Sequence, residues 1–363
     1  MAVQVPTTAL ETESIDESQG KGRALRLSST QAYYLRRLGL YLVTLWGSLT
    51  ASFLFFRLIP GDPISGIVAQ LATRGQYSDL QQSEALVEFY QKQFGLNGNL
   101  LEQYVRYFDR VLLHFDFGPS IISYPVPATD LIVRSLPWTL GLIGVATFIG
   151  WIVGVLAGTF VGWARRSRIS EAVTNICLLF SHIPAYFIAL VLVLFFSYRL
   201  GWLPANGAYD TSLNPGWSLD FIVSVIKYGT LPVLATAIVS AAGWLIGTRA
   251  LTVSLLGEDF LTYAGAKGLT PWRILTAYVL RNAWLPQIAA LGIVLGGVVN
   301  SNVIVERLFR YPGVGNLLVD SVFIKDVNTA QAVVTLFIFV VLTINLVIDL
   351  ILPLVDPRVR LER

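Results

Sequence analysis

Residues 138–162, WTLGLIGVATFIGWIVGVLAGTFVG, form an apolar run without a charged side chain. About 20 such residues in a helix cross the roughly 30 Å hydrocarbon core of a bilayer. A strand of a membrane barrel has about 9–11 residues of alternating polarity, and this run has no such alternation. The run therefore predicts a transmembrane helix and favours an all-α membrane protein.

The composition of the whole chain agrees with this prediction. Hydrophobic residues make up 54% and charged residues 13% of the 363 positions, and the mean hydropathy is +0.63. Soluble domains carry about 25% charged residues. The isoelectric point of 8.9 does not indicate a nucleic-acid partner, because no basic run is interleaved with aromatic residues. We expect the lipid bilayer as the partner and no nucleic acid.

Six segments are apolar enough to cross the membrane, and polar or Pro/Gly-marked sequence separates them. The first begins too late for a typical cleavable signal peptide, so we expect it to be retained as an anchor. The fourth is rich in small residues, which suits close helix packing in lipid. The predicted spans are 38–59, 138–162, 172–198, 229–248, 285–305 and 332–354.

The distribution of Lys and Arg predicts the orientation. One set of connecting segments holds 15 of them in 91 residues, and the other holds 10 in 134. The denser set contains both termini, which we therefore expect in the cytoplasm. The expected organisation is a disordered tail over 1–30, a first transmembrane helix over 31–59, an extracytoplasmic cap over 60–137, a transmembrane core over 138–356 and a cytoplasmic tail over 357–363.

The predicted cap contains two stretches of helical character. Leu80–Phe94 has helix-forming composition and is followed by GLNGN as a stop, and Tyr104–Phe115 indicates a second short helix. A small helical cap is our interpretation, and a flexible loop is the alternative.

A patterned loop lies on the basic side at residues 257–286, GEDFLTYAGAKGLTPWRILTAYVLRNAWLP. Gly268 suits a left-handed helix cap, with Leu269 placed for the accompanying apolar contact. Thr270 is a good N-cap and Pro271 fits the first position of a following helix. The pattern predicts a helix–glycine–helix elbow. One face of the first helix is expected to carry Phe260, Tyr263, Ala264 and Lys267, and one face of the second to carry Trp272, Leu275 and Val279.

The segments AGAKG at 264–268 and LRNAWLP at 280–286 resemble the cytoplasmic loop of permease subunits of ATP-binding-cassette importers of the dipeptide/oligopeptide/nickel family. The resemblance extends over some 330 residues. Its further motifs are YLRRLG at 34–39, IPGDP at 59–63, DFGPS at 116–120, ERLFRYPGVGN at 306–316 and DPRVR at 356–360.

The resemblance implies that the elbow docks into a groove of an ATPase subunit, with Gly268 at the turn that couples the two proteins. Relatives commonly carry Arg where this chain has Thr262 and Gly265. We therefore expect the elbow to bind the ATPase through shape complementarity and apolar contacts. The acidic pair that opens the loop either meets a basic ATPase residue or favours the helix N-terminus through its dipole. The expected coupling residues are Glu258, Asp259, Tyr263, Ala264, Ala266, Lys267, Gly268 and Leu269.

Polar residues near the end of the fifth span are candidates for the translocation pathway, because polar groups in lipid usually face protein or a water-filled cavity. Hydrogen bonding between helices is the alternative. Asp349 is expected to form a structural pair with an arginine of this chain or of a partner subunit, and contact with the solute is the alternative. His182 is expected to be packed or hydrogen-bonded, without a role as a proton carrier. The pathway candidates are Asn300, Ser301, Asn302 and Glu306.

The chain has no GxxxxGK[ST] loop to cradle ATP phosphates, so we expect no enzymatic activity and no cofactor in it. Two histidines far apart and the single Cys177 offer no metal-ligand spacing. The resemblance implies ATP and Mg²⁺ on two ATPase subunits, a second, homologous permease in a heterodimer and an external solute-binding protein. It also implies import across the inner membrane of a prokaryote, of di- or oligopeptides or alternatively oligosaccharides.

Two other function classes fit the sequence less well. An ion-coupled secondary transporter would show inverted repeats and an ionisable coupling site near mid-membrane. An intramembrane enzyme would need a positioned nucleophile or a metal motif such as HExxH, and neither occurs.

Overall fold

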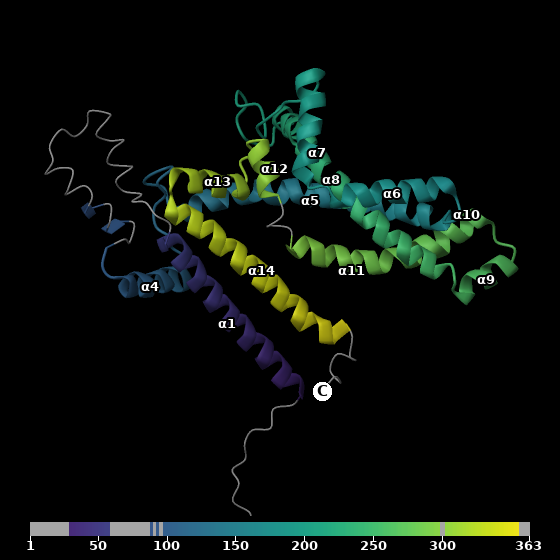
Figure 1. Cartoon of the computed structure of the whole chain (residues 1–363), viewed down its shortest axis with the longest axis horizontal. Coiled ribbons are helices and arrows are strands. Elements are labelled where there is room, and N and C mark those ends of the chain that lie inside the picture. The colour runs from purple at the N-terminus through teal and green to yellow at the C-terminus, as the bar shows by residue number, and fades with distance from the viewer. Residues whose placement is uncertain (1–28, 59–87, 90–91, 94–96, 298–301, 356–363) are drawn as a thin grey trace, which may run out of the picture.

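The computed structural model describes residues 29–58, 88–89, 92–93, 97–297 and 302–355, and all named elements in these ranges are helices (Figure 1). Four are long and apolar enough to cross a membrane. They are α1 (Ser29–Leu58), α5 (Ala128–Trp163), α8 (Leu219–Leu255) and α14 (Val327–Val355). The last three each contain one of the predicted spans, and α1 contains the described residues of the first, 38–58. Of the two predicted tails, only Ser29 and Thr30 are described, and both belong to α1.

The third predicted span, 172–198, is broken. It comprises α6 (Arg168–His182), α7 (Ala185–Leu192) and the π-helix η2 (Val193–Arg199), and the chain bends by 100° between His182 and Ala185. Pro184 lies at this break, and both Ile183 and Pro184 have extended backbone conformations. Proline disfavours the helical conformation of the preceding residue, so α6 ends there. The bent pair is a fifth crossing only if it counts as one span.

The fifth predicted span, 285–305, begins inside a longer helical run. The elements α10 (Pro271–Ile274), η3 (Leu275–Leu280) and α11 (Arg281–Gly297) follow one another directly, and the residues at both junctions keep the right-handed helical conformation. Residues 298–301 lie outside the described ranges, and α12 (Val303–Leu308) follows them. Six crossings therefore stay a prediction.

The closest approach between long helices is that of α5 to α8. Glycines recur every fourth residue along α5, and each lies against the backbone or the Cβ atoms of α8. A Cβ on Gly154 would lie 2.5 Å from the Cβ of Trp244, and one on Gly158 would lie 2.6 Å from the carbonyl oxygen of Leu245. Helix association in lipid depends on such small residues, because lipid supplies little hydrophobic driving force. The glycine stripe comprises Gly150, Gly154, Gly158 and Gly162.

Helices α1 and α14 form a second pair (Figure 1). Nη1 of Arg37 lies 2.9 Å from Oδ2 of Asp349, and the hydroxyl of Tyr33 donates to the carbonyl oxygen of Asp349 at 3.1 Å. The prediction that Asp349 pairs with an arginine is confirmed, and the partner is 312 residues away in sequence. The ion pair joins the N-terminal part of α1 to the C-terminal part of α14.

Within the predicted cap, α4 (Leu100–Asp109) and the π-helix η1 (Arg110–His114) occupy the position of the predicted helix Tyr104–Phe115. The helix begins earlier because Asn99 and Glu102 form a reciprocal capping box. The ring of Phe53 on α1 packs 5.5 Å from Tyr104, which places α4 against the Leu58 half of α1. Most of the predicted helix Leu80–Phe94 lies outside the described residues.

Candidate functional site

The α9–α10 elbow is built around a left-handed glycine. Helix α9 (Asp259–Ala266) ends at Lys267, and Gly268 has φ of +76°. The N–H of Gly268 donates to the carbonyl oxygen of Gly265 at 2.9 Å, and that of Leu269 to Ala264 at 3.3 Å. This pair of bonds is a Schellman motif, which satisfies carbonyl groups left free at the helix end. The conformation of Gly268 is the one that the sequence predicts.

The elbow has its own small core. Leu261 and Ala264 of α9 pack against residues of α10 and η3, and Leu269 closes the corner as the apolar contact of the cap. Of the face predicted for α9, Ala264 is buried and Phe260 half-buried, whereas Tyr263 and Lys267 are exposed and Leu261 is buried in addition. Leu261 and Ala264 are three residues apart and share one helix face. The buried residues of this core are Leu261, Ala264, Ile274, Leu275 and Val279.

The remaining predicted coupling residues form an exposed surface around this core. Tyr263 is 70% exposed and Trp272 is 65% exposed, and the Trp272 ring stacks on Phe160 of α5 at 6.0 Å. Glu258 precedes α9 without a side-chain capping bond. Of the eight predicted coupling residues, only Ala264 is buried and Leu269 half-buried. The exposed six are Glu258, Asp259, Tyr263, Ala266, Lys267 and Gly268.

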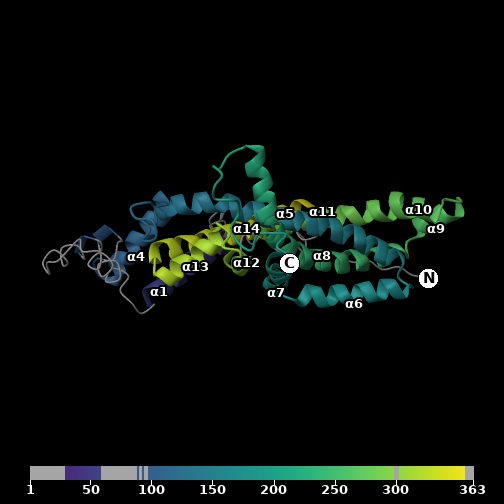
Figure 2. The same cartoon turned by 90° about the horizontal axis from the view of Figure 1, so that it is seen from above.

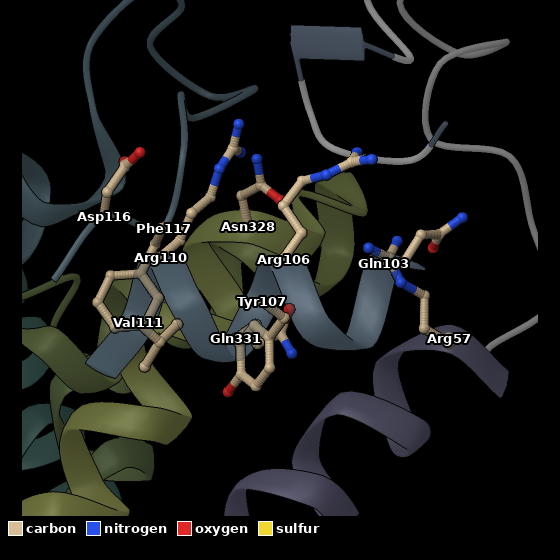
Figure 3. Close-up of a pocket in the computed structure, with 10 residues that line it drawn as sticks. All are labelled: Arg57, Gln103, Arg106, Tyr107, Arg110, Val111, Asp116, Phe117, Asn328 and Gln331. Carbon is tan, nitrogen blue, oxygen red and sulfur yellow. The ribbon is translucent and has the colours of Figure 1, made fainter. Parts of the chain in front are cut away.

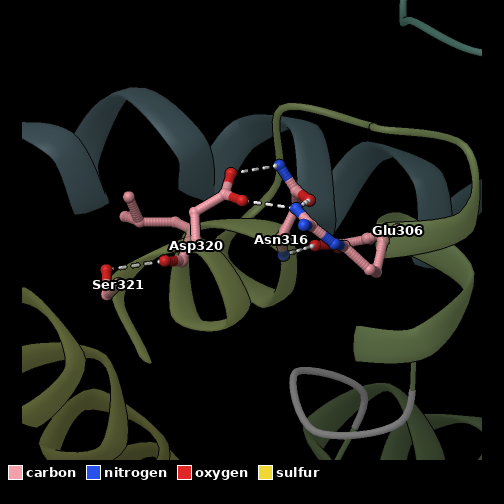
Figure 4. A network of polar contacts seen from close by, with 6 residues as sticks. Glu306, Asn316, Asp320 and Ser321 are labelled. Atoms are coloured by element: carbon pink, nitrogen blue, oxygen red, sulfur yellow. Dashed lines mark hydrogen bonds and ion pairs between the residues drawn. The ribbon is translucent and has the colours of Figure 1, made fainter. Parts of the chain in front are cut away.

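Of the predicted pathway residues, Asn302 precedes α12, and Glu306 lies at the corner between α12 and α13 (Val314–Ile324) (Figure 4). Asn300 and Ser301 lie outside the described residues. Asn302 is buried, and its Nδ2 donates to Oγ1 of Thr236 on α8 at 3.1 Å. Glu306 is 1% exposed. In the isolated chain, Asn302 therefore fits the alternative interpretation, in which these polar residues form hydrogen bonds between helices.

Glu306 caps α13. Its Oε2 accepts the backbone N–H groups of Gly315 at 2.8 Å and Asn316 at 3.2 Å, in the first turn of that helix. A carboxylate is stabilised there by the free N–H groups and the helix dipole. Gly313 leaves the space, since a Cβ on it would lie 2.3 Å from Oε2. Contact between Glu306 and a solute would require this corner to open, so the pathway role stays a prediction.

Burial changes the pKa values of two residues at this corner. Burial raises the pKa of Glu306, and two backbone hydrogen bonds oppose the change. Burial and the charge of Glu306 raise the pKa of Tyr311 to about 12.

We expect Glu306→Gln to flatten the pH dependence of stability. A carboxyl whose pKa is higher in the folded state stabilises the protein below the unfolded pKa, ordinarily 4.5, and this stabilisation is lost as pH rises through the folded pKa. Thermal unfolding in detergent from about pH 4.5 upward should show a decline for the natural chain that the variant lacks. Glu171→Gln, at an exposed position of α6, should keep the decline. An equal decline in Glu306→Gln would contradict the assignment.

Sequence reasoning missed the polar network beside Glu306 (Figure 4). Arg307 forms an ion pair with Asp320 and donates to Oδ1 of Asn316 at 3.1 Å. Asn316 in turn donates to Oδ2 of Asp320 at 3.1 Å. The three side chains join α12 to α13 across the glycine turn. The four-residue spacing of Asn316 and Asp320 was the available signal.

His182 is hydrogen-bonded, as predicted. Its Nδ1 lies 2.7 Å from the carbonyl oxygen of Leu178 and 3.1 Å from Oγ of Ser181. The described residues contain no group of three or more His, Cys, Asp or Glu side chains that could hold a metal ion.

The loop between α5 and α6 is basic, because it contains Arg165 and Arg166. The elbow and this basic loop lie at the same end of the molecule (Figures 1 and 2). Together with the spanning helices, this arrangement defines a polytopic α-helical membrane protein that presents an ordered elbow outside its spans. Residues 154–361 match the family described as "Binding-protein-dependent transport system inner membrane component". The chain belongs to this family, whose members are membrane subunits of transport systems.

Curated relatives cover nearly the whole chain. The oligopeptide transport system permease protein AppB of Bacillus subtilis (strain 168) is 30% identical over 328 residues, 90% of this chain and 99% of that protein. The glutathione transport system permease protein GsiC of Escherichia coli (strain K12) is 31% identical over 332 residues, 90% and 98%. The di/tripeptide transport system permease protein DppB of Pseudomonas aeruginosa (strain UCBPP-PA14) is 29% identical over 345 residues, 92% and 99%.

Proposed function

We propose that this chain is the permease subunit that forms half of the translocation pathway of an ATP-driven importer for di- and oligopeptides. The observation that carries the proposal is similarity along nearly the full chain to permeases named for oligopeptides, di/tripeptides and glutathione. An oligosaccharide is the alternative solute. The partners in this proposal are a second, homologous permease, two ATPase subunits that bind ATP and Mg²⁺, and an external solute-binding protein.

The elbow is the proposed contact with the ATPase. Six of the eight candidate residues are exposed, and the apolar core beneath them is formed by the elbow itself. A partner can therefore bind these six residues without unfolding the elbow. Tyr263 offers a large apolar surface with a polar tip, a residue type enriched at the centre of protein interfaces. Both termini, the basic loop and the elbow are cytoplasmic in this proposal.

The helical run from α10 to α11 suits the transmission of movement. Because α10, η3 and α11 are continuous, a displacement of the elbow carries α11 with it. Trp284 of α11 packs 5.2 Å from Trp151 of α5, and Nε1 of Trp151 donates to the carbonyl oxygen of Gln287 at 3.2 Å. Nucleotide binding by the ATPases would thus shift the bundle between two arrangements.

We expect Tyr263→Asp to separate the chain from its ATPase. The substitution places a charge in the centre of the proposed interface, and the exposure of Tyr263 makes a folding defect small. Co-purification of the tagged chain with its partners in mild detergent should show about a tenfold loss of ATPase, as for truncation of a central aromatic interface residue. Uptake of labelled di- and tripeptides should fall in parallel.

Trp217→Asp is the matched control, because Trp217 is 96% exposed in the loop between η2 and α8, away from the elbow. It should retain the ATPase. If natural chain elutes without any ATPase, coupling to ATP is refuted. If oligosaccharide uptake depends on the chain and peptide uptake does not, the proposed solute is wrong.

A further inference from the structure

An open pocket of about 40 Å³ lies where α4 and η1 meet the Leu58 end of α1 and the first turns of α14. Three arginines line it: Arg57 from α1, Arg106 from α4 and Arg110 from η1 (Figure 3). Figure 3 shows the side chains of Arg106 and Arg110 pointing to the same side of their helix. The pocket is separate from the elbow and from the α12–α13 corner.

The positive charges of this pocket outnumber the negative charges among its described lining residues. None of the three arginines forms an ion pair with a described carboxylate. Arg106 donates to Asn97, and Arg57 lies over the ring of Phe53 at 5.4 Å. Asp116 is the one acidic lining residue, and its Oδ1 accepts from the N–H of Gly118 at 2.8 Å. Three arginines and one carboxylate leave the lining with a net positive charge, which favours an anion between them.

The surface beside the pocket is apolar. Leu101 and Val105 of α4 and Leu112 of η1 share one helix face and are 70%, 60% and 40% exposed. The last turns of α1 also expose two large apolar side chains, Phe55 and Leu58. An amphipathic helix with arginines beside an exposed apolar face is typical of helices that lie in the bilayer interface.

We propose that α4 and η1 lie in the headgroup layer of the bilayer and that the arginine pocket binds the phosphodiester group of an anionic phospholipid. Arginine forks match phosphate oxygens with paired hydrogen bonds. The acyl chains of the same lipid cover the apolar faces of α4 and of α1, which a soluble anion would leave exposed. The pocket lies at one end of a spanning helix. A single lipid can therefore place its headgroup in the arginine pocket and its acyl chains on the apolar faces.

The test is titration of the detergent-purified importer complex with phosphatidylglycerol, followed by native mass spectrometry. The triple variant Arg57→Gln, Arg106→Gln, Arg110→Gln should raise the apparent Kd at least about tenfold, and Arg110→Gln alone about threefold. Among the described residues, the Arg110 side chain forms no hydrogen bond, ion pair or cation–π contact. The single variant is therefore expected to fold. Thermal unfolding checks both variants.

The matched control removes three exposed arginines of the α5–α6 loop and the start of α6, in Arg165→Gln, Arg166→Gln, Arg168→Gln, and should leave this Kd unchanged. Equal weakening by the control, or an unchanged Kd in both pocket variants, overturns the proposal. Displacement of the lipid by inorganic phosphate at equal concentration would mark a soluble-anion site. A pocket variant that keeps the lipid but loses the solute-binding protein would mark a protein contact, and either result overturns the lipid assignment.

Discussion

Gly158→Leu is expected to disrupt the packing of α5 against α8. A Cβ on Gly158 would lie 2.6 Å from the carbonyl oxygen of Leu245 and 2.8 Å from the Cβ of Thr248, and the first of these atoms is backbone. A leucine there forces the helices apart along the whole glycine stripe. Overpacking costs about 1–3 kcal/mol, and lost contacts along the pair add to it. Thermal unfolding of the detergent-purified chain should show a large drop or no folded protein.

Gly141→Leu supplies the control on the same helix. Its added Cβ meets no atom within 4 Å, so the same substitution gains side-chain volume without a clash. We expect a change within about 0.5 kcal/mol, as for other surface substitutions. Equal destabilisation by Gly141→Leu and Gly158→Leu would mean that helix composition, not the close contact with α8, sets the stability.

Hydropathy predicted the long helices because one physical requirement, the thickness of the hydrocarbon core, dictates both length and composition. It did not predict the 100° break at Pro184. Membrane helices tolerate proline where neighbours or water satisfy the freed backbone groups, so the residue alone does not distinguish a kink from a break. Packing around the bend decides between them.

The elbow was predictable where its determinants are local. Gly268 and Leu269 form the predicted cap of α9, and Pro271 begins α10 as predicted, although the Thr270 side chain makes no capping hydrogen bond. The burial of Leu261 in place of Tyr263 depends on where α10 and η3 lie, which periodicity in an eight-residue helix does not fix. The partner of Asp349 was likewise hidden, since Arg37 is brought to it by the pairing of α1 with α14.

Sequence reasoning also missed Asp326, which precedes α14 and is completely buried. Its carboxylate accepts five hydrogen bonds, three from the segment 120–122 and two from Thr329. The N–H of Ile121 donates at 2.8 Å, and the hydroxyl of Ser120 donates at 2.5 Å. One side chain therefore joins the chain segment that follows η1 to the start of α14. None of this is local, apart from the capping of α14 through Thr329.

Asp326→Ala is expected to lower the free energy of unfolding by about 3–5 kcal/mol, because several buried donors lose their only acceptor at once. Asp326→Asn keeps one carbonyl oxygen and the shape of the side chain, so its loss should be intermediate. Asp220→Ala, at an exposed position in the first turn of α8, should cost less than about 1 kcal/mol. Thermal unfolding and limited proteolysis of the segment 115–127 measure the effect. If Asp326→Ala unfolds like Asp220→Ala, the segment after η1 is held by its apolar contacts with α5 and α14 and not by the buried carboxylate.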